Sequence, residues 1–499
     1  MTPYTYNHNI YNNVKKIFIL TLFLLLFVSS RQVCGQESFY DAKVSEYGQL
    51  DEALGDKWNG IDSLIVHGPM DSLDFKVIVR CAKEGRVRVV NLQYAQVKGH
   101  RIPDEAFFDW DMYENKKKYM PIRRVILPDD ITEIGALSFF GLALQQINMP
   151  ASLRKLSDSS FEDTWIESIV IPEGVAEIPV NCFNWCRRLK KVVLPSTLKT
   201  IADLAFYAAG VDEMTLPDGL DSIGTASLYA TSFSEIIVPN SVSKIGSAAF
   251  HGNVNMKRIV FPAGMTSIPS RVCSGCPNLE EAQIPKTVKK IGLYAFSGCH
   301  KLKNISLPPN LERVGAEAFK GCQLDSLVFP ATVKYLGESA FVSGSIQKIY
   351  SLSPEPPVCG HVESYPERHT FYGSIRQDIP VYVPYGSAKK YRNAFGWSYF
   401  TNYIETDRFP TGIVSARTDN AGRYKVYGRD SRLVIEDSGV HSVSVLYSIH
   451  RIDGRLIGRG SLIKTYTSEV LPHDVYIVRV GDVAVSYTHL RAHETRGNL

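Results

Sequence analysis

Residues 302–322 read LKNISLPPNLERVGAEAFKGC, and variants of this phrase recur ten times along the chain. The proline at its seventh place marks the copies, which lie 22 or 23 residues apart, at Pro128, Pro150, Pro172, Pro195, Pro217, Pro239, Pro262, Pro285, Pro308 and Pro330. A fixed period in this range, with leucine-like residues at set offsets, is typical of a solenoid in which each repeat forms one coil. One coil cannot bury its apolar side chains alone, so neighbouring coils must stack on one another.

Each repeat is predicted to contain a short strand followed by turns. Ile305 and Leu307 lie two residues apart and face the same side of an extended chain, and the following proline has no N–H with which to continue strand pairing. A large side chain recurs later in the repeat, and we expect it to form a buried, stacked column. The members of this column are Phe139, Phe161, Phe183, Phe206, Phe250, Phe296, Phe319 and Phe341, with Leu228 and Cys273 in the two remaining copies.

A glycine occupies the turn before this large residue in six repeats, at Gly135, Gly224, Gly246, Gly292, Gly315 and Gly337. The other repeats carry Ser157, Pro179, Ala202 or Pro269 there. Because four copies have a side chain at this place, we expect that a positive φ is not required of it.

The repeated phrase resembles the BspA-like leucine-rich repeats of bacterial surface and secreted proteins, over residues 101–405. The resemblance implies a leucine-rich-repeat solenoid, an α/β-type superhelix with short parallel strands and irregular or short-helical turns. It also implies adhesion to extracellular-matrix proteins. The residues alone imply only a long surface for a ligand, because solenoids are scaffolds whose ligands vary.

The N-terminal segment, residues 1–35, has the pattern of a signal peptide. Lys15 and Lys16 precede an apolar run, Ile17–Val28, that is too short to span a bilayer, and cleavage is expected before Gln36. Cys34 leaves a lipoprotein signal as the alternative. No other segment could span a membrane, so export to the cell surface or the medium is predicted.

The remaining chain divides into a cap, repeats and a second cap. We assign residues 36–100 to an N-terminal cap, 101–345 to the solenoid and 346–406 to its C-terminal cap. In the second cap a strand at Val381–Val383 is predicted to pair with the last coil. The aromatic residues expected to close the core there are Tyr391, Phe395, Trp397 and Phe400.

After a linker at residues 407–412, the alternating pattern of residues 413–485 predicts a small β-sandwich. This portion is similar to C-terminal sorting domains of the type IX secretion system, through Asp453-Gly454-Arg455 and the stretch Leu471–Val480. A plain adhesive β-sandwich is the alternative. Residues 486–499 are polar and aperiodic, and we interpret them as a non-native tail.

Composition and motifs argue against several function classes. The net charge is +4 without a basic face, so nucleic acid is not an expected partner. Cys276, Cys299 and Cys322 are each 23 residues apart and therefore share one repeat position, which indicates buried small side chains rather than a metal site. His251 and His300 are expected to be surface residues. No catalytic motif is present, so we predict no enzyme activity, no metal and no cofactor.

The candidate ligand-binding residues form two outward-facing columns on the predicted strands. The central column lies between the two inward residues of each strand and comprises Ile126, Asn148, Val170, Val193, Thr215, Ile237, Val260, Gln283, Ser306 and Val328. The leading column lies one residue before the first inward residue and comprises Arg124, Gln146, Ser168, Lys191, Glu213, Glu235, Arg258, Glu281, Asn304 and Ser326. An apolar stripe beside charges is typical of an interaction surface. The alternative is that β-branched residues simply suit strands.

These observations predict an exported, monomeric, non-enzymatic protein whose strand face binds an extracellular protein or glycan. A structural or assembly component of the cell envelope is the second hypothesis. An enzyme with its site in a cap or in the C-terminal domain is the third.

Overall fold

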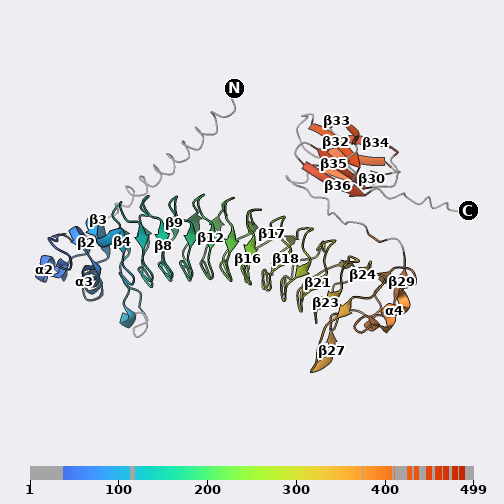
Figure 1. Ribbon diagram of the computed structural model, residues 1–499, viewed down its shortest axis with the longest axis horizontal. Helices are drawn as coiled ribbons and strands as arrows, with labels where there is room; N and C mark the ends of the chain where they lie inside the picture. The colour runs from blue at the N-terminus through green and yellow to red at the C-terminus, as the bar shows by residue number, and fades with distance from the viewer. Residues whose placement is uncertain are drawn as a thin grey trace, which may run out of the picture. The chain divides into compact units, whose positions relative to one another are not determined.

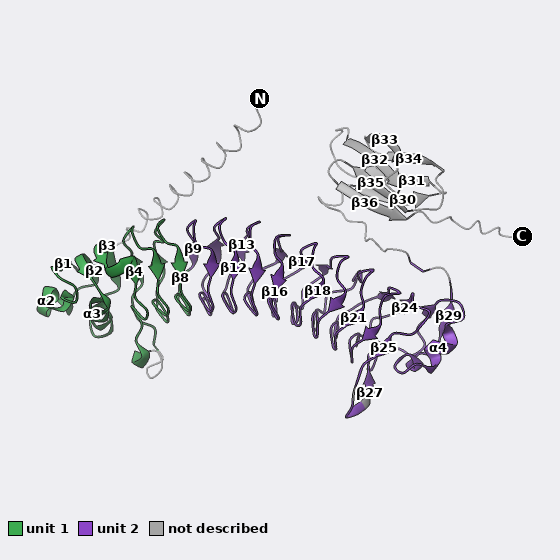
Figure 2. Cartoon of the chain, viewed as in Figure 1, with its two compact units in different colours: residues 1–166 green, residues 167–499 purple. Residues whose placement is uncertain are grey.

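The computed structural model describes residues 38–112, 118–373, 375–406 and 409–410, together with seven strands between residues 424 and 488. It consists of two compact units, residues 1–166 and 167–499 (Figure 2). The predicted signal segment and most of the predicted linker lie outside the described residues. Among the helices that are described, none has the length and apolar character needed to cross a membrane.

Unit 1 contains two parallel sheets. The larger has the order β1-β2-β3-β5-β7 and consists of β1 (Phe39–Lys43), β2 (Ser63–Met70), β3 (Val89–Val97), β5 (Arg124–Ile126) and β7 (Gln146–Ile147). The smaller has the order β4-β6-β8 and consists of β4 (Arg101–Ile102), β6 (Glu133–Ile134) and β8 (Lys155–Leu156). Strands β1 to β3, within the predicted cap, therefore belong to the same sheet as the first repeat strands.

The first coils of unit 1 differ from the repeats because they contain helices, α2 (Leu50–Leu54), η1 (Gly55–Trp58), α3 (Ser72–Lys83) and η2 (Lys98–His100). Helix α3 begins with a capping box, in which Asp71 accepts from the Leu73 N–H and Asp74 accepts from the Asp71 N–H at 2.9 and 2.8 Å. The buried Asp74 carboxylate also accepts from the N–H groups of Gly48 and Leu50, both at 2.9 Å. One carboxylate thus fixes the start of α3 and the segment that leads into α2.

The repeats of unit 2 have two strands per coil, whereas the sequence analysis predicted one. The first strands are β9 (Ser168–Val170), β11 (Lys191–Val193), β13 (Glu213–Met214), β15 (Glu235–Ile237), β17 (Arg258–Val260), β19 (Glu281–Gln283), β22 (Ser326–Phe329) and β24 (Lys348–Ser351). The second strands are β10 (Glu177–Ile178), β12 (Thr200–Ile201), β14 (Ser222–Ile223), β16 (Lys244–Ile245), β18 (Ser267–Ile268), β20 (Lys290–Ile291), β21 (Arg313–Val314), β23 (Tyr335–Leu336) and β25 (Val358–Cys359). Strands of successive coils pair in parallel in runs of three to five, and the ladder is interrupted between β13 and β15, between β16 and β18 and between β19 and β22 (Figure 1).

The solenoid fold is confirmed, but the coils contain no helix between residues 121 and 345, all of which are described. The predicted short parallel strands and irregular turns are thus present, and a coil of 22 or 23 residues divides among two short strands and the turns that join them.

The predicted phenylalanine column is confirmed within each unit. In unit 1, Phe139 and Phe161 stack with ring centroids 5.1 Å apart. In unit 2, Phe183 stacks on Phe206 at 5.2 Å, and Phe319 stacks on its neighbours Phe296 and Phe341 at 5.4 Å. Leu228 and Cys273, which replace phenylalanine in two coils, are fully buried as well.

Two backbone positions per coil adopt a positive φ. The first lies two residues after the turn glycine and is never glycine, with φ between 49° and 58°, in Leu137, Ser159, Asn181, Leu204, Ala226, Ala248, Arg271, Tyr294, Glu317 and Ser339. The second lies two residues after the large residue, at Gly141, Asp163, Trp185, Ala208, Ala230, Gly252, Gly275, Gly298 and Gly321. The turn glycine itself has no positive φ, and it serves close approach instead, since a Cβ on Gly315 would lie 2.6 Å from the backbone of Gly292.

The C-terminal coils close the core of unit 2 with aromatic side chains. The predicted strand Val381–Val383 is confirmed as β28, which lies between β24 and β29 (Tyr403–Glu405) in the order β22-β24-β28-β29. Helices α4 (Ala388–Asn393) and η4 (Trp397–Tyr399) place Tyr391 and Trp397 in the core with no exposure. Phe395 was wrongly predicted to close the core, since its side chain is 48% exposed in the turn between these two helices.

Two further features complete unit 2. An antiparallel hairpin of β26 (His361–Val362) and β27 (Tyr365–His369) projects from the last coils (Figure 1). Beyond residue 423 the strands form two antiparallel sheets, ordered β30-β31-β34 and β33-β32-β35-β36. They are β30 (Tyr424–Arg429), β31 (Arg432–Asp437), β32 (Val445–Arg451), β33 (Leu456–Leu462), β34 (Thr465–Val470), β35 (Val475–Val480) and β36 (Val483–Thr488). The last strand extends three residues into the segment interpreted as a tail, while the sandwich itself stays a prediction.

Candidate ligand-binding face

The first strands present the two predicted columns on one face because their middle residue points inward. Ile169, Val192 and Ile259 are 4%, 3% and 0% exposed, whereas the residues on either side of each are exposed or half-buried. Residues of one column are direct partners across neighbouring strands, as Val193 is with Val170 and Val260 with Ile237. We call this surface the strand face; each unit has its own part of it.

The central column exposes aliphatic side chains along unit 2. Val170, Val193 and Ile237 are 37%, 42% and 59% exposed. Val260, Gln283 and Val328 are half-buried, and Thr215 is exposed. In unit 1 the column contributes the half-buried Ile126. Solvent-exposed aliphatic side chains thus recur along one line of the face.

The charges of the leading column are paired with each other across strands. Lys191 Nζ lies 3.0 Å from Glu213 Oε2. Arg258 lies between Glu235 and Glu281, with its Nε 3.2 Å from Glu281 Oε2 and an ion pair to Glu235. These exposed pairs contribute at most about 1 kcal/mol each to stability, but they neutralise the charge beside the aliphatic line.

Three members of the columns do not present a free side chain on a strand. Asn148 forms two hydrogen bonds with the backbone of Leu127, since its Oδ1 accepts from the N–H at 2.6 Å and its Nδ2 donates to the C=O at 3.0 Å. Asn304 and Ser306 lie in residues 302–308, where no strand forms. Pro308 is the only one of the ten repeat prolines that is followed by another proline. The second proline restricts Pro308 to extended conformations, and this segment forms no hydrogen bonds of a strand ladder.

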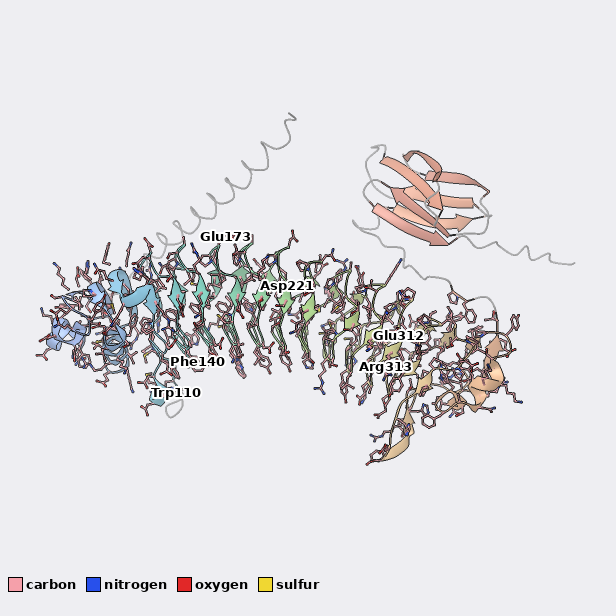
Figure 3. All side chains as sticks on the ribbon, in the orientation of Figure 1. Trp110, Phe140, Glu173, Asp221, Glu312 and Arg313 are labelled. Atoms are coloured by element: carbon pink, nitrogen blue, oxygen red, sulfur yellow. The ribbon has the colours of Figure 1, made fainter. Side chains whose placement is uncertain are left out.

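Strand propensity alone does not explain the aliphatic line. The second strands also have one outward residue each, and these are Glu177, Thr200, Ser222, Lys244, Ser267, Lys290, Arg313, Tyr335 and Val358 in unit 2. Only Val358, in the last of these strands, is aliphatic. Arg313 is labelled in Figure 3, and its guanidinium lies 4.3 Å from the centre of the ring of Tyr335 in the next coil. The leading column is polar as well. Only one of three outward columns is therefore apolar, although all three lie on strands.

The sequence analysis missed the continuation of the central column beyond the repeats. Strand pairing places Val328, Tyr350, Tyr382 and Ile404 in one line across β22, β24, β28 and β29. The repeated phrase fades after Pro330, so no constant offset could identify these residues. The alternation of inward and outward residues around Tyr350 and Tyr382 was the remaining signal.

The described histidines and cysteines of the solenoid lie apart from one another or are buried in its core. His251 was wrongly predicted to be a surface residue, because it is half-buried and stacks on Tyr229 at 4.6 Å. His300 is exposed, with Nδ1 3.0 Å from the Gly321 oxygen. The thiols of Cys276, Cys299 and Cys322 are buried and donate to backbone oxygens at 3.2–3.3 Å. The described residues contain no group of three His, Cys, Asp or Glu side chains placed to hold a metal ion.

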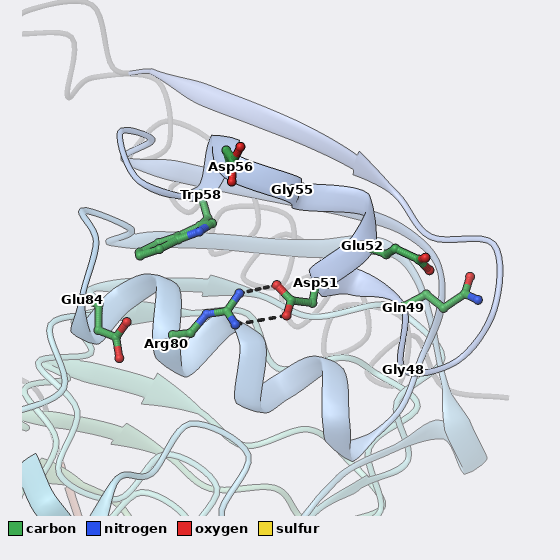
Figure 4. Close-up of a pocket in the computed structure, with 9 residues that line it drawn as sticks. All are labelled: Gly48, Gln49, Asp51, Glu52, Gly55, Asp56, Trp58, Arg80 and Glu84. Carbon is green, nitrogen blue, oxygen red and sulfur yellow. Dashed lines mark hydrogen bonds and ion pairs between the residues drawn. The ribbon is translucent and has the colours of Figure 1, made fainter.

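An open hollow of about 710 Å³ lies in the first coils of unit 1 (Figure 4). Its lining includes Asp51, Glu52 and Asp56, and the guanidinium of Arg80 pairs with Asp51 and lies 5.5 Å from the Trp58 ring. The hydrogen bond from Arg80 lowers the pKa of the Asp51 carboxyl. The lining of the hollow is thus mainly acidic, and its one arginine is paired with Asp51.

These features define a leucine-rich-repeat solenoid protein. Its repeats are similar to the family profile described as "BspA type Leucine rich repeat region", which matches residues 113–232 and 221–347 in six copies. No curated protein matches the chain in sequence.

Several solved structures are similar to parts of this chain. A leucine-rich repeat protein from Bacteroides ovatus ATCC 8483 is 21% identical with a TM-score of 0.42, and the match covers 56% of this chain and 65% of that one. The pneumococcal vaccine antigen PcpA is 19% identical with a TM-score of 0.43, covering 63% and 86%. The T. pallidum leucine-rich repeat protein is 24% identical with a TM-score of 0.28, covering 36% and 78%. The chain thus spans about two thirds of the Bacteroides ovatus protein, at 65%.

Proposed function

We propose that this protein is an exported, non-enzymatic interaction protein whose strand face binds an extracellular protein or glycan. The observation that carries the proposal is the single line of exposed aliphatic residues, Val170, Val193 and Ile237, beside charges that are already paired. Exposed aliphatic side chains are costly to keep in water, and a partner that covers them stabilises the complex. The leucine-rich-repeat class is compatible with such a role.

Location and domain organisation are parts of the same proposal. Residues 1–35 would direct export, residues 36–406 would form the capped solenoid, and residues 413–485 would serve type IX sorting or adhesion. The mature protein would be secreted or attached to the cell surface, and it would act as a monomer.

The test replaces Val193, Ile237 and Val260 together with serine in the full chain. The control replaces Val180, Val254 and Leu293 with serine, because these aliphatic residues are 36%, 53% and 41% exposed in the same unit but lie off the strand face. Binding is measured to a panel of extracellular-matrix proteins, to a glycan array and to bacterial envelope fractions. Loss of a matrix or glycan ligand in the strand-face variant alone supports the proposal.

Other outcomes contradict it. Equal binding by both variants would show that the strand face is not the binding surface. Capture from envelope fractions only would favour a structural role in the cell envelope.

A further inference from the structure

The C-terminal end of the strand face differs in chemistry from the repeats. There the central column runs Val328, Tyr350, Tyr382, Ile404 in direct strand register. The aliphatic members of the repeat coils are thus replaced by two adjacent tyrosines flanked by aliphatic residues. Tyrosine is enriched among the residues that dominate the binding energy of protein interfaces.

The two tyrosine rings are stacked against each other. Their centroids are 4.6 Å apart and the ring planes differ by 13°. Both side chains are half-buried, and among the described residues neither hydroxyl has a hydrogen-bond partner. Each ring covers one face of the other, and the outer faces of the pair lie toward Val328 and Ile404 in strand register.

Lys348 supplies a charge beside this pair. It is exposed in the leading column of the same strand as Tyr350, with Nζ 5.9 Å from the centre of the Tyr350 ring. In the coils before it, Lys191 and Arg258 are paired with glutamates of neighbouring strands. Lys348 has no ion pair with any described residue, so a positive charge is left at this end of the face.

We propose that Tyr350, Tyr382 and Lys348 form the anchoring end of the strand face and bind a protein segment that carries a carboxylate beside apolar side chains. This inference rests on the proposed function and specifies its partner. The ammonium group selects a carboxylate, and the tyrosine edges, between Val328 and Ile404, accept apolar groups and a backbone hydrogen bond. A sugar ring would need an open aromatic face for stacking, whereas one face of each ring here is covered by the other ring and the outer faces adjoin Val328 and Ile404 in strand register.

The experiment selects a phage-displayed library of random dodecapeptides on the full chain. The selected peptides are then measured on Lys348→Glu, on the double variant Tyr350→Ala/Tyr382→Ala and on Tyr350→Phe/Tyr382→Phe, which keeps the ring packing. Two control variants match them. Tyr207→Ala/Tyr229→Ala removes another stacked pair, at 4.4 Å, that lies in the turns, and Lys244→Glu reverses an exposed charge on a second strand.

The expected result is enrichment of peptides with an aspartate or glutamate next to aliphatic or aromatic residues. Their affinity should fall at least about tenfold in Lys348→Glu and in the alanine double variant, and should stay unchanged in both controls. Circular dichroism and thermal melting show that the charge-reversal and phenylalanine variants fold as the parent does.

Three outcomes would overturn the inference: peptides without a shared acidic residue, equal binding by Lys348→Glu and its control, or a glycan ligand that depends on Tyr350 and Tyr382. If the serine variant of Val193, Ile237 and Val260 loses its ligand while these variants keep it, the proposed function stands and this inference fails. If the tyrosine and lysine variants lose ligand binding and the serine variant keeps it, the binding site lies at this end of the strand face and not in the repeat coils.

Discussion

Phe319 stacks on Phe296 with ring centroids 5.4 Å apart and ring planes 11° from parallel, and both side chains are fully buried. The two residues are 23 positions apart, which is one repeat. This relationship shows how the period of the sequence becomes contact in space. Each coil places its large side chain directly on that of the coil before it, so the core of unit 2 is continuous from one coil to the next.

Truncation of this column should be costly. Phe319→Ala is expected to lower the free energy of unfolding by about 3–5 kcal/mol, because it removes contacts to two neighbouring rings and leaves a cavity. The matched control is Phe395→Ala, which removes an equal side chain that is 48% exposed and should change stability by about 0.5 kcal/mol or less. Urea unfolding followed by circular dichroism measures both, and equal midpoints would contradict the packing described for Phe319.

The turns with a positive φ predict opposite effects of exchanging glycine and alanine. Ala230→Gly should stabilise by a few tenths of a kcal/mol to about 1 kcal/mol, since Ala230 has a φ of 50° that glycine adopts without strain. Gly298→Ala at the equivalent turn should destabilise by about 1 kcal/mol, because its φ is 77° although the nearest atoms to an added Cβ are 3.7 Å away. Thermal melting of the two single variants tests the sign, and shifts in the same direction would refute the interpretation.

Asn148 is expected to act in stability rather than in ligand binding. Asn148→Ala should cost about 1–3 kcal/mol, because it removes both hydrogen bonds to the Leu127 backbone and exposes no new partner for these groups. Hydrogen exchange at the Leu127 amide should accelerate in the same variant. Gln283→Ala is the control, since the side chain of Gln283 donates a hydrogen bond to the exposed Glu281 at 2.6 Å, and its effect should stay within about 0.5 kcal/mol.

The buried thiols predict a loss of stability in alkaline solution. Burial raises the pKa of Cys81 to about 11 and that of Cys359 to about 12. An unfolded thiol has a pKa of about 8.5, so the unfolded chain releases these protons at a lower pH than the folded protein does. Above that pH, deprotonation lowers the free energy of the unfolded chain relative to that of the folded protein. The contribution of the two protonated thiols to stability is therefore complete below about pH 8.5, and it is lost as the pH rises toward their folded-state pKa values.

Urea midpoints at pH 7.5 and pH 10 measure this effect. The parent should lose more stability between the two pH values than a variant with Cys81→Ala and Cys359→Ala. An equal loss in both proteins would show that these thiols do not contribute to the alkaline dependence.

Much of the fold follows from residue spacing. The recurring proline and the phenylalanine at a constant offset were sufficient to predict the stacked coils and their buried column. The second strand of each coil was missed because two residues, such as Lys290 and Ile291, carry no periodicity of their own. Only pairing with the same two residues in the next coil makes them a strand.

By itself, the sequence determined that the coils repeat and stack, since identical spacing places each apolar side chain on the equivalent side chain of the next coil. Tertiary structure alone decided which outward residues are available to a partner. It paired Arg258 with two glutamates, engaged Asn148 with the Leu127 backbone and aligned Tyr350 with Tyr382 outside the repeats. The physical reason is that burial of apolar groups is encoded by local periodicity, whereas hydrogen bonding and charge pairing on a surface depend on neighbours that are distant in the chain.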